Sequence, residues 1–259
     1  MKITLIQTDI VWSSPQDNID RIEAVIKANG HSDLYVLPEM WATGFAIRPE
    51  GTAEPEDSSL ALAWMKEKAR QLGCAISGSL AVRVADGTFR NRHYFVTPSE
   101  DTTVFYDKRH LFTHGHEDEF YTCGQQPVIA RWQGWRLLLQ TCYDLRFPVF
   151  SRYGLAGEYD AIVYVANWPD RRQLAWHTLV RARAIENQCY VMAVNRVGDD
   201  SMCHYAGGSA VIDPVGRTVA ECATGEDQAT TTVSLEKLME MRSHFLVLAD
   251  RDRPGQPCG

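Results

Sequence analysis

The sequence has no excess of basic residues and no long apolar run. Its 259 residues include 26 Lys and Arg against 33 Asp and Glu, which gives a formal net charge of −7. A nucleic-acid-binding protein needs a basic face, so this balance argues against that class. No apolar stretch approaches the roughly 18 residues of a membrane-spanning helix. The first ten residues lack the features of a secretory signal. We therefore expect a cytoplasmic protein with neither nucleic acid nor membrane as a partner.

Cysteine pairs are also missing. The seven cysteines form no CxxC motif, and their number is odd. Both observations argue against a disulfide framework and against a structural zinc site. Most of the cysteines lie in apolar segments that predict strands, where cysteine is a small core residue. A reducing compartment fits this usage. Cys142 differs from the others because Asp144, Arg146 and Pro148 follow it directly.

Helical and extended patterns alternate along the chain. Helices are predicted at 14–30, 58–73, 148–156, 172–188 and 234–245. Strands are predicted at 2–8, 33–39, 74–82, 93–97, 103–108, 127–132, 135–141, 160–167, 189–197 and 229–234, with hairpin turns at 84–89 and around 213–216. The alternation indicates an α/β fold, and the hairpins mean that its sheets are not purely parallel. No linker divides the chain, so we expect one domain over 1–250 and a tail over 251–259.

Three reactive side chains follow three of the predicted strands. Glu39 follows "LYVLP", Lys108 follows "TVFYD" and Cys142 follows "WRLLLQT". Ligands of α/β sheets gather beyond the carboxyl ends of strands, so these residues can converge. A thiolate is a strong nucleophile that a nearby ammonium favours, and a carboxylate can take its proton. Taken singly, each also fits a bland interpretation: a core cysteine, a surface acid and a solvated lysine.

The segments around these residues resemble a known family. "LPEMWATGF", "YDKRHLF" and "CYDLRFP" look like the three signature blocks of the nitrilase superfamily, the carbon–nitrogen hydrolases, in the family's order and spacing. "VANWPDRR", "RARAIENQCYVMAVNRVG" and "GGSAVIDPVGR" also resemble family blocks. The resemblance implies a four-layer α-β-β-α sandwich that dimerises through one helical face. It implies that Glu39 is the general base, Lys108 the cation that stabilises the intermediate and Cys142 the nucleophile.

The family's second active-site glutamate has two candidates. In "HEDEFYTCG", Glu117 fits the expected position best, and Glu119 is its rival. The same loop also carries His110, His114 and His116, and clusters of histidine and carboxylate can bind metal. Gly115 interrupts any helix that would align these histidines, so we expect no metal site and no cofactor. A thiol-protease-like pair of Cys142 with one histidine remains an alternative without a supporting local signature.

Substrate recognition is predicted from residues near the nucleophile. Arg146 lies four residues past Cys142, and its guanidinium suits a substrate carboxylate. The alternative is that Arg146 pairs with Asp144 as scaffolding. "CYDLRFP" with "VANWP" looks most like the omega-amidase branch, whose members hydrolyse the terminal amide of 2-oxoglutaramate or 2-oxosuccinamate. By that resemblance, Phe45 and Trp168 help to wall a small pocket.

Two other functions stay open. One is an amidase, nitrilase or carbamoyl hydrolase of the same superfamily that acts on a different substrate. The other is a non-catalytic binding protein on the same scaffold, which the intact set of Glu39, Lys108 and Cys142 argues against. We therefore expect a cofactor-independent amidase that acts on a small-molecule amide and forms a homodimer or a higher homo-oligomer.

Overall fold

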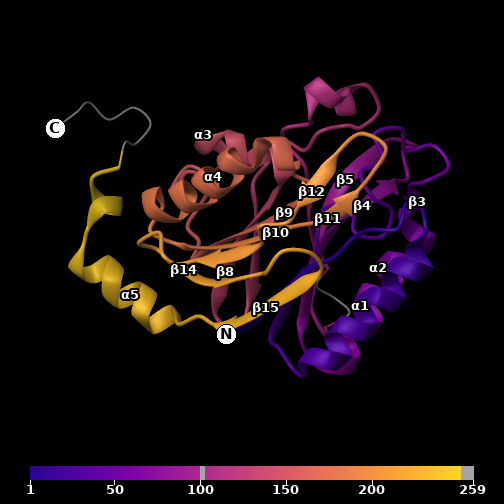
Figure 1. Cartoon of the computed structure of the whole chain (residues 1–259). Helices are drawn as coiled ribbons and strands as arrows, with labels where there is room; N and C mark the ends of the chain where they lie inside the picture. The colour runs from indigo at the N-terminus through magenta and orange to yellow at the C-terminus, as the bar shows by residue number, and fades with distance from the viewer. Residues whose placement is uncertain (100–102, 252–259) are drawn as a thin grey trace.

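The computed structural model describes residues 1–99 and 103–251. Its strands are β1 (Lys2–Gln7), β2 (Leu34–Val36), β3 (Glu54–Pro55), β4 (Ala75–Arg83), β5 (Phe89–Val96), β6 (Val104–Asp107), β7 (Val128–Trp132), β8 (Trp135–Thr141), β9 (Ala161–Ala166), β10 (Tyr190–Asn195), β11 (Val197–Asp199), β12 (His204–Ala206), β13 (Ala210–Ile212), β14 (Thr218–Glu221) and β15 (Asp227–Thr232). Its α-helices are α1 (Pro15–Asn29), α2 (Leu60–Leu72), α3 (Pro148–Ser151), α4 (Gln173–Glu186) and α5 (Leu235–His244) (Figure 1).

Two mixed sheets form the centre of the molecule. The first has the strand order β15-β1-β2-β4-β5-β6, with β3 beside β4. In it, β1, β2 and β4 are parallel, whereas β15, β5 and β6 pair antiparallel with their neighbours. The second sheet has the order β14-β13-β10-β9-β8-β7, with a parallel centre of β8, β9 and β10. The near-continuous apolar runs of these central strands are typical of strands that are buried on both faces.

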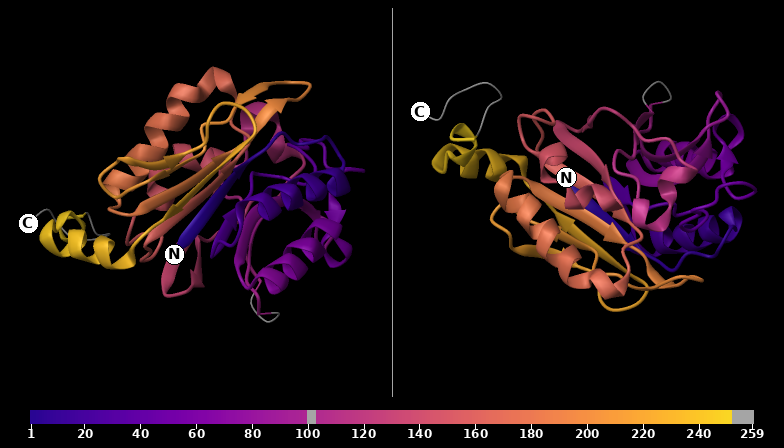
Figure 2. Two further views of the ribbon diagram at one scale, coloured as in Figure 1. Left: turned by 60° about the horizontal axis from the view of Figure 1, so that its bottom comes forward. Right: turned by 90° about the horizontal axis from the view of Figure 1, so that it is seen from above.

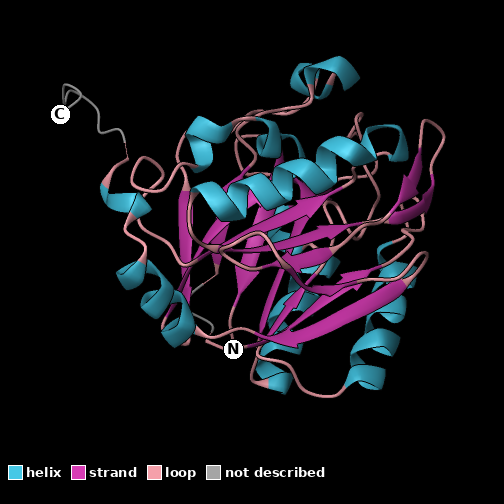
Figure 3. Cartoon of the chain, turned by 60° about the vertical axis from the view of Figure 1, so that its left-hand side comes forward, coloured by secondary structure: helices cyan, strands magenta, loops and turns pink. Residues whose placement is uncertain are grey.

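The sheets pack face to face, and helices cover their outer faces (Figures 2 and 3). One apolar cluster joins the two sheets and includes Leu5, Val36, Leu137 and Val163. A second cluster joins the first sheet to α1 and α2, and a third joins the second sheet to α4. Three apolar layers between four layers of secondary structure make an α-β-β-α sandwich. The predicted fold is confirmed.

The structure corrects two predicted elements. The helix predicted at 148–156 ends at Ser151, because Arg152 is extended and Gly154 adopts a positive φ of 91°. The strand predicted at 189–197 ends at Asn195. The side chain of Asn195 donates hydrogen bonds to the carbonyls of Trp168 and Gly207. The chain then turns out of the sheet and forms the separate two-stranded ribbon of β11 and β12.

Apart from Arg251, the predicted tail 251–259 lies outside the described residues. Within the described ranges, every helix is too short or too polar to cross a lipid bilayer.

Candidate active site

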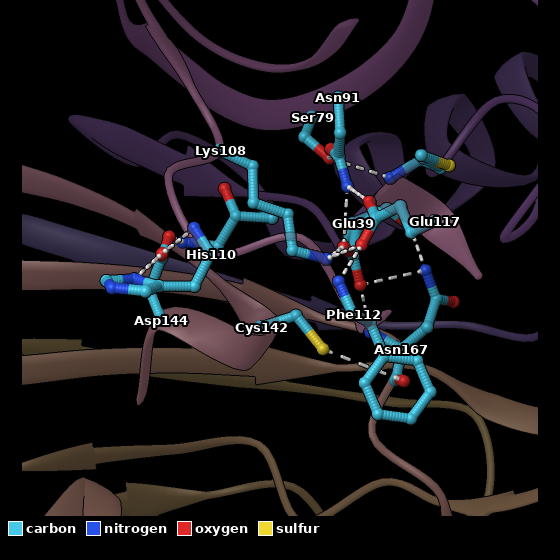
Figure 4. A network of polar contacts seen from close by, with 12 residues as sticks. Glu39, Ser79, Asn91, Lys108, His110, Phe112, Glu117, Cys142, Asp144 and Asn167 are labelled. Atoms are coloured by element: carbon cyan, nitrogen blue, oxygen red, sulfur yellow. Dashed lines mark hydrogen bonds and ion pairs between the residues drawn. The ribbon is translucent and has the colours of Figure 1, made fainter. Parts of the chain in front are cut away.

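The three predicted reactive residues meet between the two sheets. Glu39 lies three residues past β2, Lys108 directly past β6 and Cys142 directly past β8. All three side chains are buried, Cys142 with 8% of its surface exposed and the other two with 1% or less. Figure 4 shows them around one polar network. The strand ends therefore bring together an acid, a base and a thiol, as the sequence predicted.

Lys108 bridges two carboxylates. Its Nζ donates to Oε1 of Glu39 at 2.9 Å and to Oε2 of Glu117 at 2.8 Å. Burial alone would lower the pKa of Lys108, but the negative charges of Glu117 and Glu39 outweigh it and raise that pKa well above its usual value. Lys108 is therefore an ammonium ion with one N–H left for a third acceptor.

Asn167 and Asn91 hold the carboxylate of Glu39 in place. The backbone N–H of Asn167 donates to Oε2 at 2.9 Å, and Asn91 Nδ2 donates to Oε1 at 2.7 Å. Asn167 Nδ2 also donates to the backbone carbonyl of Glu39 at 2.7 Å. A carboxylate that accepts several N–H groups is stabilised in its charged form. The arrangement therefore presents Glu39 as a proton acceptor.

Glu117 occupies the predicted position of the second glutamate. It is buried, and its Oε2 also accepts the backbone N–H of Phe112 at 2.7 Å. Burial raises the pKa of Glu117, and the positive charge of Lys108 opposes this effect. Its rival Glu119 is exposed and pairs with His116 at 2.8 Å. The geometry thus favours Glu117 over Glu119.

The backbone at Cys142 is strained into a tight turn. Cys142 has a φ of 45°, which is uncommon for a residue with a side chain, and it begins a 3-10 turn over Cys142–Arg146. Asp144 fixes this turn, because its Oδ2 accepts the N–H of Thr141 at 2.9 Å and the hydroxyl of Tyr106 at 2.8 Å. This anchor accounts for the acidic residue that follows the nucleophile so closely. The N–H groups at the start of such a turn lack partners within it and can receive a negatively charged oxygen.

The thiol of Cys142 feels opposing effects. Burial and the negative charge of Glu39 raise its pKa well above the usual value. Lys108 lowers that pKa, in the direction that the sequence predicted, but its effect is the smaller one. Sγ donates a weak hydrogen bond to the carbonyl of Asn167 at 3.8 Å. The resting group is therefore a neutral thiol that must transfer its proton as it reacts.

The three histidines of the loop have separate surroundings. His110 Nδ1 lies 2.8 Å from Oδ1 of Asp144, and its ring stacks on Phe147. His116 pairs with Glu119, and His114 packs against Phe112 at the rim of a pocket. Within residues 1–99 and 103–251, no three His, Cys, Asp or Glu side chains are grouped as metal ligands. No histidine is a hydrogen-bond partner of the Cys142 thiol in those ranges.

A pocket of about 280 Å³ opens above the thiol. Phe45, Asn167 and Trp168 line it beside Cys142. Phe45 also faces the ammonium of Lys108, 5.3 Å from the ring centre, and Trp168 is 2% exposed. The two aromatic residues predicted to wall a pocket therefore do so.

Four arginines surround this pocket. They are Arg48, Arg146, Arg171 and Arg172. The guanidinium of Arg146 lies 4.9 Å above the ring of Trp168, and that of Arg172 lies 5.2 Å above Phe112. Over the described ranges, none of the four forms an ion pair with a carboxylate. Arg146 does not pair with Asp144, which is held by His110, Tyr106 and Thr141.

Among the described residues that line the pocket, Asp200 alone carries a carboxylate, and its oxygens already accept hydrogen bonds. Asp200, at the tip of the β11–β12 ribbon, accepts the hydroxyl of Tyr205 at 2.6 Å and the N–H groups of Met202 and Cys203. Burial and the neighbouring charge of Arg171 lower the pKa of Arg172. The wall therefore carries positive charge that its own acid does not neutralise. It can bind an anionic group.

Sequence reasoning missed several residues of this site. Asn167 lies in the "VANWP" block, but its type gave no sign that it would hold Glu39. Asn91 lies in β5, which begins at Phe89 rather than at the predicted residue 93. Arg48, Arg171 and Arg172 are ordinary surface residues in the sequence, and only the fold brings them to one pocket.

Comparison with known proteins agrees with this geometry. Residues 2–243 match the model of the carbon-nitrogen hydrolase family. The chain is 42% identical over 256 residues to the omega-amidase YafV of Escherichia coli strain K12, across 97% of each chain. It is 33% identical to the 2-oxoglutaramate amidase of Bacillus subtilis, across 96% of each.

A solved structure gives the same result. XC1258 from Xanthomonas campestris is described as a CN-hydrolase superfamily protein with an arsenic adduct in its active site. It superposes with a TM-score of 0.92 at 41% identity and covers 99% of each chain. These matches span nearly the whole sequence and confirm the resemblance found in its motifs: the chain belongs to the carbon-nitrogen hydrolase family.

Proposed function

We propose that this protein is an omega-amidase, which hydrolyses the terminal amide of a small carboxylate-bearing substrate such as 2-oxoglutaramate or 2-oxosuccinamate. The observation that carries the proposal is the pocket itself. A buried thiol lies at its floor, and four arginines without carboxylate partners among the described residues line its wall. A guanidinium binds a carboxylate through two parallel N–H donors. The names of the relatives, omega-amidase and 2-oxoglutaramate amidase, support the same substrate class.

In the first half of the reaction, the amide is converted to a thioester. The proton of Cys142 Sγ passes to Glu39 as the sulfur bonds to the amide carbon. The carbonyl oxygen becomes negatively charged and accepts the remaining N–H of Lys108 and the N–H of Tyr143 at the start of the turn. When this intermediate collapses, the C–N bond breaks and Glu39 returns the proton to the nitrogen. Ammonia leaves, and the acyl group stays on Cys142.

In the second half, water replaces the nitrogen. Glu39 removes a proton from water as the oxygen bonds to the thioester carbon, and Lys108 again faces the charged oxygen. Breaking the C–S bond releases the dicarboxylic acid, and the thiol recovers the proton from Glu39. Because Glu117 bonds to Lys108 through its Oε2, it holds the ammonium in position during both halves.

Arg146 is the specificity residue of this proposal. It follows the nucleophile within one short turn, lines the pocket and is only half-buried. The ring of Trp168 holds the guanidinium of Arg146 above it, because cations and aromatic faces attract. The far carboxylate of the substrate then meets a charge fixed relative to Cys142.

The test is ammonia release from a panel of compounds. The panel contains 2-oxoglutaramate, 2-oxosuccinamate, neutral amides of similar length, small nitriles and carbamoyl compounds. The proposal expects kcat/KM to be highest for the two acidic amides. A preference for a nitrile, a carbamoyl compound or a neutral amide would assign the chain to another activity of its family. Absence of any hydrolysis would favour a binding protein.

A homodimer is part of the same proposal. Apolar side chains are exposed on α3 and α4, with Val149 at 71% and Leu174 at 82%, and Leu155 lies exposed between them in sequence. A second copy can bury such a surface. Sedimentation equilibrium should give a dimer or a multiple of it. A Val149→Asp and Leu174→Asp double variant should shift the mass toward the monomer. A monomeric parent protein at micromolar concentration would reject this part.

A further inference from the structure

Asn91 lies between the two active-site carboxylates on the side opposite Cys142 in Figure 4. Its Nδ2 donates to Oε1 of Glu39 at 2.7 Å and to Oε1 of Glu117 at 3.0 Å. Its backbone carbonyl accepts the N–H of Lys108 at 2.9 Å. One residue of β5 thus contacts three of the four groups that the proposed reaction uses. It is 1% exposed and does not line the pocket.

Ser79 fixes the orientation of that amide. The backbone N–H of Met40 donates to Ser79 Oγ at 2.9 Å, and an N–H cannot accept in return. The Ser79 hydroxyl hydrogen is therefore free to donate to Asn91 Oδ1, which lies 2.9 Å away. Oδ1 is the acceptor of the amide, so Nδ2 must face the two glutamates. Because the Met40 N–H can only donate, it sets the direction of each hydrogen bond from Ser79 through Asn91 to the two glutamates.

The same serine holds the segment that carries Glu39. The Ser79 N–H donates to the carbonyl of Pro38 at 3.4 Å, and the Ser79 carbonyl accepts the N–H of Trp41 at 3.3 Å. Between them, Met40 adopts a φ of 45°, which is strained for a residue with a side chain. Ser79 therefore joins the backbone turn beside Glu39 to the amide that contacts its carboxylate.

The charges around Asn91 show why donors are needed there. Two carboxylates share one ammonium ion in a buried site, and like charges this close favour protonating one of them. A carboxyl group that turned its O–H toward Asn91 would find only N–H donors there. The hydrogen bonds that Asn91 donates to Oε1 of Glu39 and to Oε1 of Glu117 thus favour the ionised form of both acids.

We propose that Asn91, oriented by Ser79, is a positioning residue that keeps Glu39 and Glu117 both ionised, so that Glu39 is free to accept the thiol proton. This inference rests on the proposed cysteine mechanism and assigns to β4 and β5 a part in setting the pH range of the reaction. The other titratable groups that face the two carboxylates are Lys108, Cys142 and Tyr121.

The test compares two variants with a matched control. Asn91→Asp keeps the shape, removes both donated hydrogen bonds and adds a third acid. Ser79→Ala removes the hydroxyl that fixes the amide. Asn18→Asp is the control, because Asn18 is also buried and its Nδ2 donates to the backbone carbonyls of Val11 and Ala42 rather than to a carboxylate.

The readout is the rate at which iodoacetamide alkylates Cys142 as a function of pH, followed by mass spectrometry of the Cys142 peptide. This rate needs no substrate, so it is independent of the omega-amidase proposal. Where the parent protein hydrolyses an amide, the pH profile of kcat/KM is the second readout. Folding of each variant is checked by its near-ultraviolet circular dichroism.

In Asn91→Asp, the acid limb of both profiles should move to higher pH by about one unit or more, because a neighbouring acid raises a carboxyl pKa. Ser79→Ala should move it in the same direction by less, and Asn18→Asp should lower only the melting temperature. If Asn91→Asp fails to fold, Ser79→Ala decides. An acid limb that stays in place in a folded variant, as in the control, overturns the inference. A parent protein that alkylates as proposed but hydrolyses no amide would overturn only the substrate assignment.

Discussion

The floor and the wall of the pocket are built in opposite ways. The floor is Cys142 together with the charged residues beneath it, Glu39, Lys108 and Glu117. These three are fully buried, and each charge has a partner of opposite sign. In the wall, the four arginines have no carboxylate partner among the described residues, and three of them lie over aromatic rings. A buried charge must be paired, whereas a guanidinium that reaches solvent can stay unpaired until a ligand binds. The charges of the floor are therefore paired within the protein, and those of the wall are available to pair with a substrate.

The largest expected effect is at the floor. Cys142→Ala should abolish turnover, because no other group can form the thioester, and should leave the fold intact, because the lost atom is small and lies at a pocket. Low concentrations of iodoacetamide should then no longer label residue 142. Ammonia release measured on the purified variant checks this. Retained activity would remove the covalent mechanism altogether.

Glu39→Gln is expected to have the next largest effect. The variant keeps the shape but cannot accept a proton, so kcat should fall by at least ~100-fold, the usual scale for a lost general base. Steady-state kinetics with the best amide of the panel measure the loss. A decrease of only a few fold would show that another group takes the thiol proton.

Arg146→Met tests the wall. A lost hydrogen bond to a charged group costs ~1.5–3 kcal/mol, so kcat/KM for 2-oxoglutaramate should fall about 10- to 150-fold. The value for a neutral amide should change little, because the floor is untouched. A thermal melt serves as the control. Equal losses on both substrates together with a lower melting temperature would mean that Arg146 supports the fold. It would then not be a substrate-binding residue of the wall.

Glu117→Gln sharpens the division within one loop. The substitution removes the negative charge that lies beside Lys108, but the amide keeps an oxygen that can accept the hydrogen bond from Lys108. We expect kcat to fall about tenfold, which corresponds to ~1.4 kcal/mol. Glu119→Gln, two residues away and exposed, is the matched control and should have no measurable effect. A greater loss in Glu119→Gln would mean that the second glutamate has been misplaced.

The smallest expected effect is that of chelation. Prolonged dialysis against EDTA should leave activity unchanged, because the thiol and Glu39 supply the nucleophile and the base that a metal-bound water would otherwise supply. Activity assays before and after dialysis measure this. A loss that zinc or manganese restores would move the reaction centre to the histidine loop.

The same contrast explains what the sequence could and could not predict. Glu39, Lys108 and Cys142 follow apolar strands within short motifs, so local pattern and resemblance were enough to find them. Asn91 was missed because β5 begins with the polar run Arg90–Arg92, where no alternation of apolar residues marks a strand, although Asn91 itself is buried. Asn167 was inside a recognised block, but its function depends on Glu39, 128 positions away.

Electrostatics were the least predictable part. The sequence predicted that Lys108 would favour the thiolate of Cys142, and Lys108 does lower the pKa of that thiol. The net shift is nevertheless upward, because burial and the charge of Glu39 outweigh Lys108, and only the folded chain sets these two effects. The arginines of the wall come from three separate segments, and no spacing rule joins Arg48 to Arg171. The ribbon of β11 and β12 escaped prediction because Asn195 ends an otherwise continuous apolar run.

The pairing of β1 with β15 has a consequence for biosynthesis. Lys2 pairs with Thr232, so β1 can pair with β15 only after about 230 further residues have been synthesised. At about 5–20 residues per second, that wait is on the order of 10 to 50 s. During this time β1 presents an unpaired edge rich in isoleucine and leucine, which is a template for aggregation. A nascent chain released before residue 227 would already contain Glu39, Lys108, Cys142 and every arginine of the wall. It would lack β15, the strand that pairs with β1 at the edge of the first sheet. Such a chain would depend on chaperones to avoid aggregation, although all of its catalytic groups were present.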